Sequence, residues 1–116
     1  MTEHIFEKID IADKFSSRLH GMTGIENVPD GYAMFFPRCS SIHMMHMSVA
    51  LDIVYLDGSL TILGIETLKP WKFGHAPKGT RNVLETKDGW AAAVHAAVGD
   101  RIDLAGCWEK EHRRSK

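Results

Sequence analysis

The sequence predicts an α+β domain, in which about six short strands form a mainly antiparallel, β-barrel-like sheet with two short helices at its ends. Short runs rich in β-branched and aromatic residues recur along the chain, as is typical of strands. Turn-forming Gly, Pro and Asp residues separate these runs. Because few helical patterns fall between consecutive strands, parallel βαβ units are disfavoured.

Length and charge narrow the class of protein. The chain has 116 residues and a formal net charge of −1 at pH 7. This length predicts a single domain over residues 1–116, and the charge disfavours nucleic acid or an anionic membrane as a partner. No apolar run reaches the ~20 residues of a membrane-spanning helix, and charges interrupt the N-terminus where a signal peptide is apolar. We therefore expect a cytoplasmic protein with Cys39 and Cys107 as free thiols and a frayed basic tail from about residue 109.

The N-terminal third contains three candidate elements. Residues 4–11 fit a short strand, and a helix fits them nearly as well. Residues 12–20 fit a helix, because Phe15 and Leu19 form an apolar i, i+4 pair. After a glycine-containing loop, residues 32–36 fit a buried strand that Pro37 ends.

The middle of the chain predicts a further strand and a hairpin. Residues 41–47 are the candidate strand, and the run from Ala50 to Asp57 is the densest β-forming sequence in the chain. Asp57-Gly58 follows, and a second strand-like run occupies residues 59–67. An Asp-Gly pair between two such runs favours a type I′ turn, so we expect a positive φ at Gly58.

The last third predicts two strands around a helix. Residues 82–86 and 101–108 fit strands, whereas Pro70 excludes a central strand nearby. Asp88 is a suitable N-cap for a helix over residues 90–98, and Gly99 suits the position after its C-terminus.

A cluster of soft ligands suggests copper(I) as one possible cargo. Thiolate, imidazole and thioether groups suit this ion, and they occur close together at Cys39, His43, Met44, Met45, His46 and Met47. On a regular strand, however, alternate side chains point to opposite faces, which separates His43 and Met47 from His46. Methionine is also a common filler of irregular cores, so core packing is the competing interpretation.

Two carboxylates in apolar strands are the candidates for polar chemistry. Asp52 lies between Leu51 and Ile53, and burial requires a partner for its charge or raises its pKa. His43 is the nearest side chain in sequence that could pair with it, and bracing of a turn through backbone N–H groups is an equally good interpretation. Glu85 lies in a second apolar strand, and Trp71 follows Pro70 in a loop, where it could line a pocket or fill one end of the sheet.

At these residues the chain resembles a small, β-rich prokaryotic family known as domain of unknown function 192, over about residues 12–104. The resemblance rests on Cys39, Ile42-His43, Met47, Leu51-Asp52, Pro70-Trp71-Lys72, Val83-Leu84-Glu85 and Gly99-Asp100. Gly21-Met22-Thr23 departs from the Gly-Leu-Met that usually follows the family's first helix. The resemblance implies a β-barrel-like α+β fold and no particular reaction.

The sequence contains no GxSxG, P-loop, GxGxxG or HExxH motif. We therefore expect a non-catalytic module that binds a small molecule or a peptide, without a cofactor or resident metal. The expected ligand-binding residues are His43, Met47, Asp52, Trp71 and Glu85. Two alternatives are a hydrolase-like enzyme with a His43/Asp52 acid–base pair and a copper-handling protein that uses His43, His46 and Met47.

Overall fold

Strand β4, Leu51–Leu56, lies inside the larger of two sheets and is buried along its whole length. The computed structural model describes residues 2–12, 27–42, 44 and 47–104. Strand β4 pairs with a neighbour on each edge, and an apolar cluster packs on each of its faces. This double burial explains why its sequence is an almost continuous apolar run, interrupted only by Asp52, instead of an alternation of apolar and polar residues.

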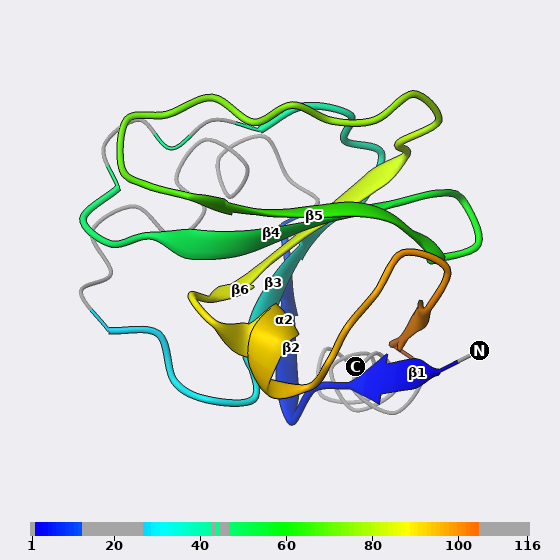
Figure 1. The fold of residues 1–116 in the computed structure, drawn as a ribbon, viewed down its shortest axis with the longest axis horizontal. Coiled ribbons are helices and arrows are strands. Elements are labelled where there is room, and N and C mark those ends of the chain that lie inside the picture. Colours follow the sequence, from blue (N-terminus) through cyan, green and yellow to red (C-terminus); the bar gives the residue numbers. More distant parts are fainter. Residues whose placement is uncertain (1, 13–26, 43, 45–46, 105–116) are drawn as a thin grey trace, which may run out of the picture.

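The larger sheet has five strands in the order β2-β3-β6-β4-β5. Its other members are β2 (Lys8–Ile11), β3 (Tyr32–Phe36), β5 (Ile62–Leu68) and β6 (Asn82–Lys87). Strands β2 and β3 pair in parallel, and the other pairs are antiparallel. The sheet twists strongly, so that β4 and β5 cross the direction of β2 and β3 (Figure 1). Because β2 and β5 do not pair with each other, the described residues form an open sheet, and the barrel-like closure is not confirmed.

A second, smaller sheet consists of β1 (Glu3–Ile5) and β7 (Arg101–Asp103), which pair in parallel. The single strand expected at residues 4–11 is therefore two strands. The chain bends between them, where the backbone N–H groups of Glu7 and Lys8 both donate to the carbonyl of Gly31, at 2.8 and 3.2 Å. The backbone N–H of Ile102 donates to the carbonyl of Leu60 at 3.0 Å, which connects β7 to the segment that leads into β5.

The described residues contain seven strands and one short helix, α2, at Trp90–Ala93, so the fold is mostly β. The prediction of a helix over residues 90–98 was too long. Its N-cap is Gly89, with φ of 92°, and this residue has no side chain to cap the helix, so the predicted role of Asp88 as the N-cap was wrong. The chain leaves the helix through His95, at φ of 55°, and Gly99 then donates to the carbonyl of Ile62 at 2.9 Å. The helix expected at residues 12–20 lies, except for Ala12, outside the described residues.

The β4–β5 hairpin is confirmed, but the predicted type of turn was wrong. The positive φ belongs to Leu60, at 67°, and Gly58 has an ordinary φ. Asp57 decides this geometry, because its carboxylate accepts the backbone N–H groups of Ser59 and Thr61 at 2.8 and 3.0 Å. Its carbonyl also accepts the N–H of Leu60 at 3.1 Å. The result is a three-residue loop with one left-handed residue, a common alternative to the two-residue type I′ turn.

The strand predicted at residues 41–47 is absent from the described part of that segment, which forms a loop. Its backbone pairs with the loop after β5: the N–H of Met44 donates to the carbonyl of Lys72, and the N–H of Trp71 donates to the carbonyl of Met44, both at 2.7 Å. Met44 and Met47 are buried in one of the two apolar clusters. The two loops together therefore cover one face of the larger sheet. In the described part of the chain, no helix is long and apolar enough to span a membrane.

Candidate functional site

The two candidate carboxyl groups lie on opposite faces of the larger sheet. Asp52 pairs in register with Thr86, whereas Glu85 pairs with Ile53. Residues opposite each other on neighbouring strands share a face, and successive residues alternate between faces. Asp52 and Glu85 therefore point away from each other and do not line one pocket.

Asp52 anchors the short helix to the sheet. The side chain is only 1% exposed. One carboxylate oxygen accepts the hydroxyl of Thr67 at 2.7 Å, and the other accepts the backbone N–H of Ala91, in α2, at 2.9 Å. These bonds satisfy both oxygens of a charge that would be costly to bury alone. As in the bracing interpretation from the sequence, Asp52 bonds to a backbone N–H, but this N–H belongs to the helix α2 and not to a turn.

Glu85 has a different environment. Its side chain is 4% exposed and accepts no hydrogen bond from any other described residue. Burial alone raises the pKa of this carboxyl from its ordinary value of 4.5 to about 8. At neutral pH the group is therefore mostly protonated, and it can donate a hydrogen bond through its O–H.

Two further carboxylates, Asp10 and Glu66, lie on the same face of the sheet as Glu85, in one row of residues that are paired across neighbouring strands. The row crosses the sheet as Asp10, Met34, Glu85, Ile53 and Glu66. A tyrosine hydroxyl on the same face donates to each outer carboxylate: Tyr32 to Asp10 at 2.7 Å and Tyr55 to Glu66 at 2.5 Å.

The hydrogen bonds made by these carboxylates distinguish them from Glu85. Glu66 also accepts the backbone N–H of His75 at 2.7 Å. Although partial burial opposes ionisation, its bonds to Tyr55 and His75 lower the pKa of Glu66. The outer carboxylates of this row are thus hydrogen-bonded, whereas the carboxyl of Glu85 forms no hydrogen bond with another described residue.

The remaining predicted site residues are dispersed. Met47 is 7% exposed and belongs to the apolar cluster on the Glu85 face. Trp71 lies in the loop after β5, with φ of 68° and 56% of its surface exposed. His43 and His46 lie outside the described residues, so the His43–Asp52 pair and the copper site stay predictions. Within the described ranges, no three His, Cys, Asp or Glu side chains gather closely enough to hold a metal ion.

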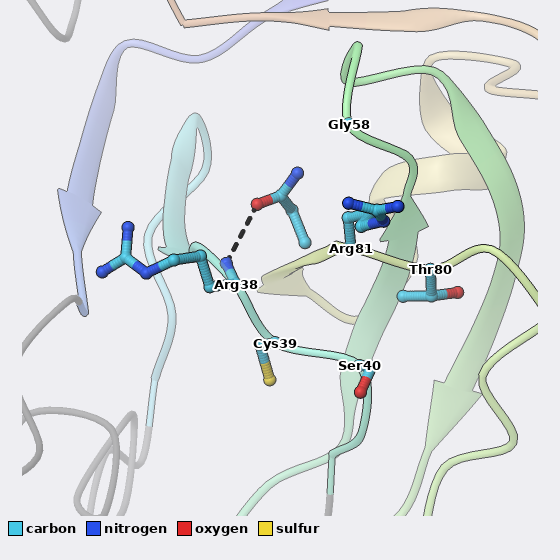
Figure 2. Close-up of a pocket in the computed structure, with 7 residues that line it drawn as sticks. Arg38, Cys39, Ser40, Gly58, Thr80 and Arg81 are labelled. Carbon is cyan, nitrogen blue, oxygen red and sulfur yellow. Dashed lines mark hydrogen bonds between the residues drawn. The ribbon is translucent and has the colours of Figure 1, made fainter.

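A hollow of about 530 Å³ lies at the end of the sheet where β3 ends and β6 begins. Three segments enclose it: the chain after β3, the β4–β5 turn and the chain before β6. We call it the arginine hollow, and its lining residues are Arg38, Cys39, Ser40, Gly58, Thr80, Arg81 and Asn82. Figure 2 shows Arg38 and Arg81 on different walls, with the Arg38 side chain extending away from Arg81.

Hydrogen bonds fix the backbone around the arginine hollow. The Asn82 side chain accepts the N–H of Arg38 at 3.1 Å (Figure 2) and donates to the carbonyl of Asp57 at 2.9 Å. The N–H of Cys39 donates to the carbonyl of Arg81 at 2.9 Å. The free thiol of Cys39 donates to the carbonyl of Ser41 at 3.0 Å. Asn82 thereby ties two of the enclosing segments to the hairpin turn.

The backbone of Arg38 is strained. Its φ is 52°, in the left-handed region that costs a non-glycine residue roughly 1–2 kcal/mol. Strain of this kind persists where the surrounding structure imposes it, and it is concentrated at functional sites. The backbone N–H of this strained residue donates to Asn82, which lines the same hollow.

The charge of the arginine hollow is positive. Arg38 and Arg81 are both exposed, and none of the described residues that line the hollow is acidic. Arginine presents a planar fork of donors that matches carboxylate and phosphate groups. The sequence analysis missed these residues, because Arg38 and Arg81 are separated in sequence and no local motif connects them. The only available signal was the Pro37-Arg38 step directly after a strand.

Comparison with known proteins identifies the family. The sequence profile of domain of unknown function 192, described as "Uncharacterized ACR", matches residues 2–104. The chain belongs to this family. The match begins earlier than the expected residue 12, and it confirms the resemblance drawn from the sequence.

Relatives and a solved structure agree with this assignment. A UPF0127 protein of Thermococcus sibiricus is 35% identical over 115 residues, which cover 93% of this chain and 70% of the relative. A UPF0127 protein of Pyrococcus abyssi is 28% identical over 102 residues, which cover 83% of this chain and 85% of the relative. The crystal structure of a Novosphingobium aromaticivorans protein of unknown function aligns with a TM-score of 0.75 and 23% identity, over 84% of this chain and 74% of that one. These likenesses establish a conserved family and its fold, and they assign no reaction.

Proposed function

We propose that the protein is a non-catalytic binding module that takes a small anionic molecule in the arginine hollow. The observation that carries this proposal is a hollow of about 530 Å³ with two arginines and no acidic residue among its described lining. A volume of this size suits a small-molecule ligand. The preferred ligand class is a compound with carboxylate or phosphate groups.

The available donors favour an anion over a neutral ligand. Among the polar lining groups, Asn82, Thr80 and Cys39 already make hydrogen bonds within the protein. Arg81 and the Ser40 hydroxyl remain the groups best placed to donate to a ligand. Turning the exposed Arg81 side chain inward costs about 0.5–1.5 kcal/mol, which is small beside a charge-assisted hydrogen bond of roughly 1.5–3 kcal/mol.

Binding without catalysis fits this lining better than a hydrolase does. Apart from the Cys39 thiol, the described lining has no side chain that could act as a general base near neutral pH. The alternative acid–base pair would use Asp52, whose two oxygens are already occupied by Thr67 and Ala91. The lining and its charge therefore favour an anion site at the β3–β6 end of the sheet, and the ligand site expected at His43, Met47, Asp52, Trp71 and Glu85 stays a prediction.

Titration calorimetry with pyrophosphate and with citrate tests the proposal. We expect saturable binding that weakens as NaCl is raised, because salt screens exposed charges. Arg81→Gln should weaken the binding about tenfold, as expected for the loss of one charge-assisted contact. Lys69→Gln removes the same charge from an exposed residue outside the hollow and should leave the affinity unchanged.

Backbone amide NMR shifts locate the ligand in the same titration. We expect the shifts to concentrate at residues 38–40 and 80–82. The proposal fails if neither anion saturates the protein, or if Lys69→Gln weakens binding as much as Arg81→Gln.

A further inference from the structure

A second hollow lies at the opposite end of β6, beside α2. Its volume is about 490 Å³. We call it the tryptophan hollow, and its lining residues are Ile5, Phe6, Glu7, Asp30, Gly31, Thr86, Lys87, Asp88, Gly89, Trp90, Ala93 and Val94. The arginine hollow includes Asn82, the first residue of β6, and the tryptophan hollow includes Lys87, the last. At ~3.3 Å per residue the length of this strand places the two hollows roughly 17 Å apart.

The apolar part of the tryptophan hollow is held in a fixed position. The Trp90 ring stacks on Phe6, with centroids 5.0 Å apart and an angle of 27° between the planes. Its second contact is with His4, at 5.5 Å and 76°, in an edge-on arrangement. Ile5 and Val94, which also line the hollow, are 74% and 41% exposed. The hollow thus presents an ordered aromatic ring and exposed aliphatic side chains to a ligand.

The charge of the tryptophan hollow is negative. Its lining includes the carboxylates of Glu7, Asp30 and Asp88 and the ammonium of Lys87. The Lys87 Nζ lies 3.1 Å from an Asp30 carboxylate oxygen, so these two charges offset each other. Glu7 and Asp88 are exposed and form no ion pair with another described residue. Among the described residues, these two carboxylates are therefore without an ion-pair partner at the edge of an apolar hollow.

We infer that the tryptophan hollow binds a small organic cation with an apolar body, of the class of an aryl-alkyl amine. The apolar body packs on Trp90 and Val94, and the ammonium group lies between the Glu7 and Asp88 carboxylates. An aromatic ring within reach of the cation adds an attraction of its own, and charge complementarity selects cations over anions. The inference is independent of the anion site, because the two hollows share no residue.

Titration with 2-phenylethylammonium, followed by amide and indole NMR shifts, tests the inference. We expect saturable shifts at Gly31, Trp90 and Ala93, and no shifts at residues 38–40. The anion 3-phenylpropionate has a similar shape and should bind at least tenfold more weakly. Equal affinity for the two compounds would overturn the inference, because the hollow would then select only apolar bulk.

Charge variants identify the groups that hold the ammonium. Glu7→Gln and Asp88→Asn together should weaken 2-phenylethylammonium binding about tenfold and raise the relative affinity for 3-phenylpropionate. Glu3→Gln changes an exposed carboxylate that does not line the hollow and should have no effect. An unchanged affinity in the double variant would contradict the assignment of the ammonium position.

Two variants that each add a bulky side chain to α2 distinguish binding in the hollow from binding elsewhere. Ala92 and Ala93 are both exposed residues of α2, but only Ala93 lines the hollow. Ala93→Leu should therefore occupy part of the space and weaken binding at least fivefold, whereas Ala92→Leu should not. Thermal melting of both variants confirms that the fold is retained. Equal effects of the two substitutions would place the amine outside the hollow and overturn the inference.

Discussion

Asp52 and Glu85 are both carboxyl groups in the interior of buried strands, and the protein stabilises them in opposite ways. Asp52 receives a hydroxyl and a backbone N–H, so it remains buried with its charge satisfied. Glu85 receives no hydrogen bond from any other described residue, and its pKa rises to about 8 because of burial. The first group fixes a helix to a sheet, and from the second we expect a stability that depends on pH.

The titration of Glu85 predicts a loss of stability with rising pH. The carboxyl binds its proton more tightly in the folded than in the unfolded protein, so its contribution to stability is fully present below pH 4.5 and is lost as the pH rises to about 8. In Glu85→Gln this loss should disappear. Relative to the parent, the variant should gain roughly 2 to 4 kcal/mol between pH 5 and pH 8.5.

Urea unfolding at a series of pH values measures this difference. The difference in the free energy of unfolding between the variant and the parent isolates Glu85, because the other titratable groups contribute equally to both proteins. Glu3→Gln, at an exposed position of β1, serves as the control and should follow the parent curve. Parallel curves for Glu85→Gln and the parent would show that Glu85 ionises normally.

At the scale of elements, the turns depend on individual backbone angles that side-chain contacts impose. Asp57 places the left-handed residue of the hairpin at Leu60 instead of Gly58. Gly89, by contrast, has φ of 92° and precedes α2. A Cβ atom added at Gly58 or at Gly89 would meet no other atom within 4 Å. The two glycines therefore differ in backbone conformation and not in available space.

This pair gives a prediction about glycine substitution. Gly58→Ala should be neutral or should stabilise by about 0.4–1 kcal/mol, because alanine restricts the unfolded chain and fits the native φ. Gly89→Ala should destabilise by roughly 1 kcal/mol or more, because alanine is strained at a positive φ. Chemical denaturation of both variants tests the difference. A greater loss of stability in Gly58→Ala than in Gly89→Ala would contradict this prediction. It would indicate a positive φ at Gly58, as in the type I′ turn that the sequence favours.

At the scale of the whole molecule, β4 and β6 form the centre and the two hollows lie at the ends. Strand β6 pairs with β3 and β4, and β4 pairs with β5 and β6. Residues Val83–Thr86 of β6 and all of β4 are buried. The smaller β1–β7 sheet has only three residues in each strand. Stability should therefore decrease from the β4–β6 pair toward the β1–β7 pair.

Hydrogen exchange of backbone amides measures this gradient. Amides of β4 and β6 should exchange only through global unfolding, whereas those of β1 and β7 should open locally. We expect protection to differ by on the order of 100-fold between the two sets. Uniform protection across both sheets would mean that the small sheet unfolds together with the large one.

The sequence by itself determined the strands whose patterns are local. The run at residues 32–36 coincides with β3, and the hairpin formed by β4 and β5 follows from two β-forming runs around Asp57-Gly58. Alternation along β4 also puts Asp52 on one face with Val54 and Leu56, because the side-chain period of a strand is independent of its partners. The strand that contains Glu85 was also predicted from its local pattern.

Tertiary structure decided what depends on partners distant in sequence. The methionine-rich segment has a strand-like composition, but its described backbone pairs with the loop at Lys72 instead of a strand. The helix predicted over residues 90–98 ends at Ala93, and the chain then leads through His95, with φ of 55°, to β7, which pairs with β1. Arg38 and Arg81 enclose one hollow only because β3 and β6 are neighbours in the sheet. Strand order is set by the burial of whole faces, and no local pattern of residues encodes it.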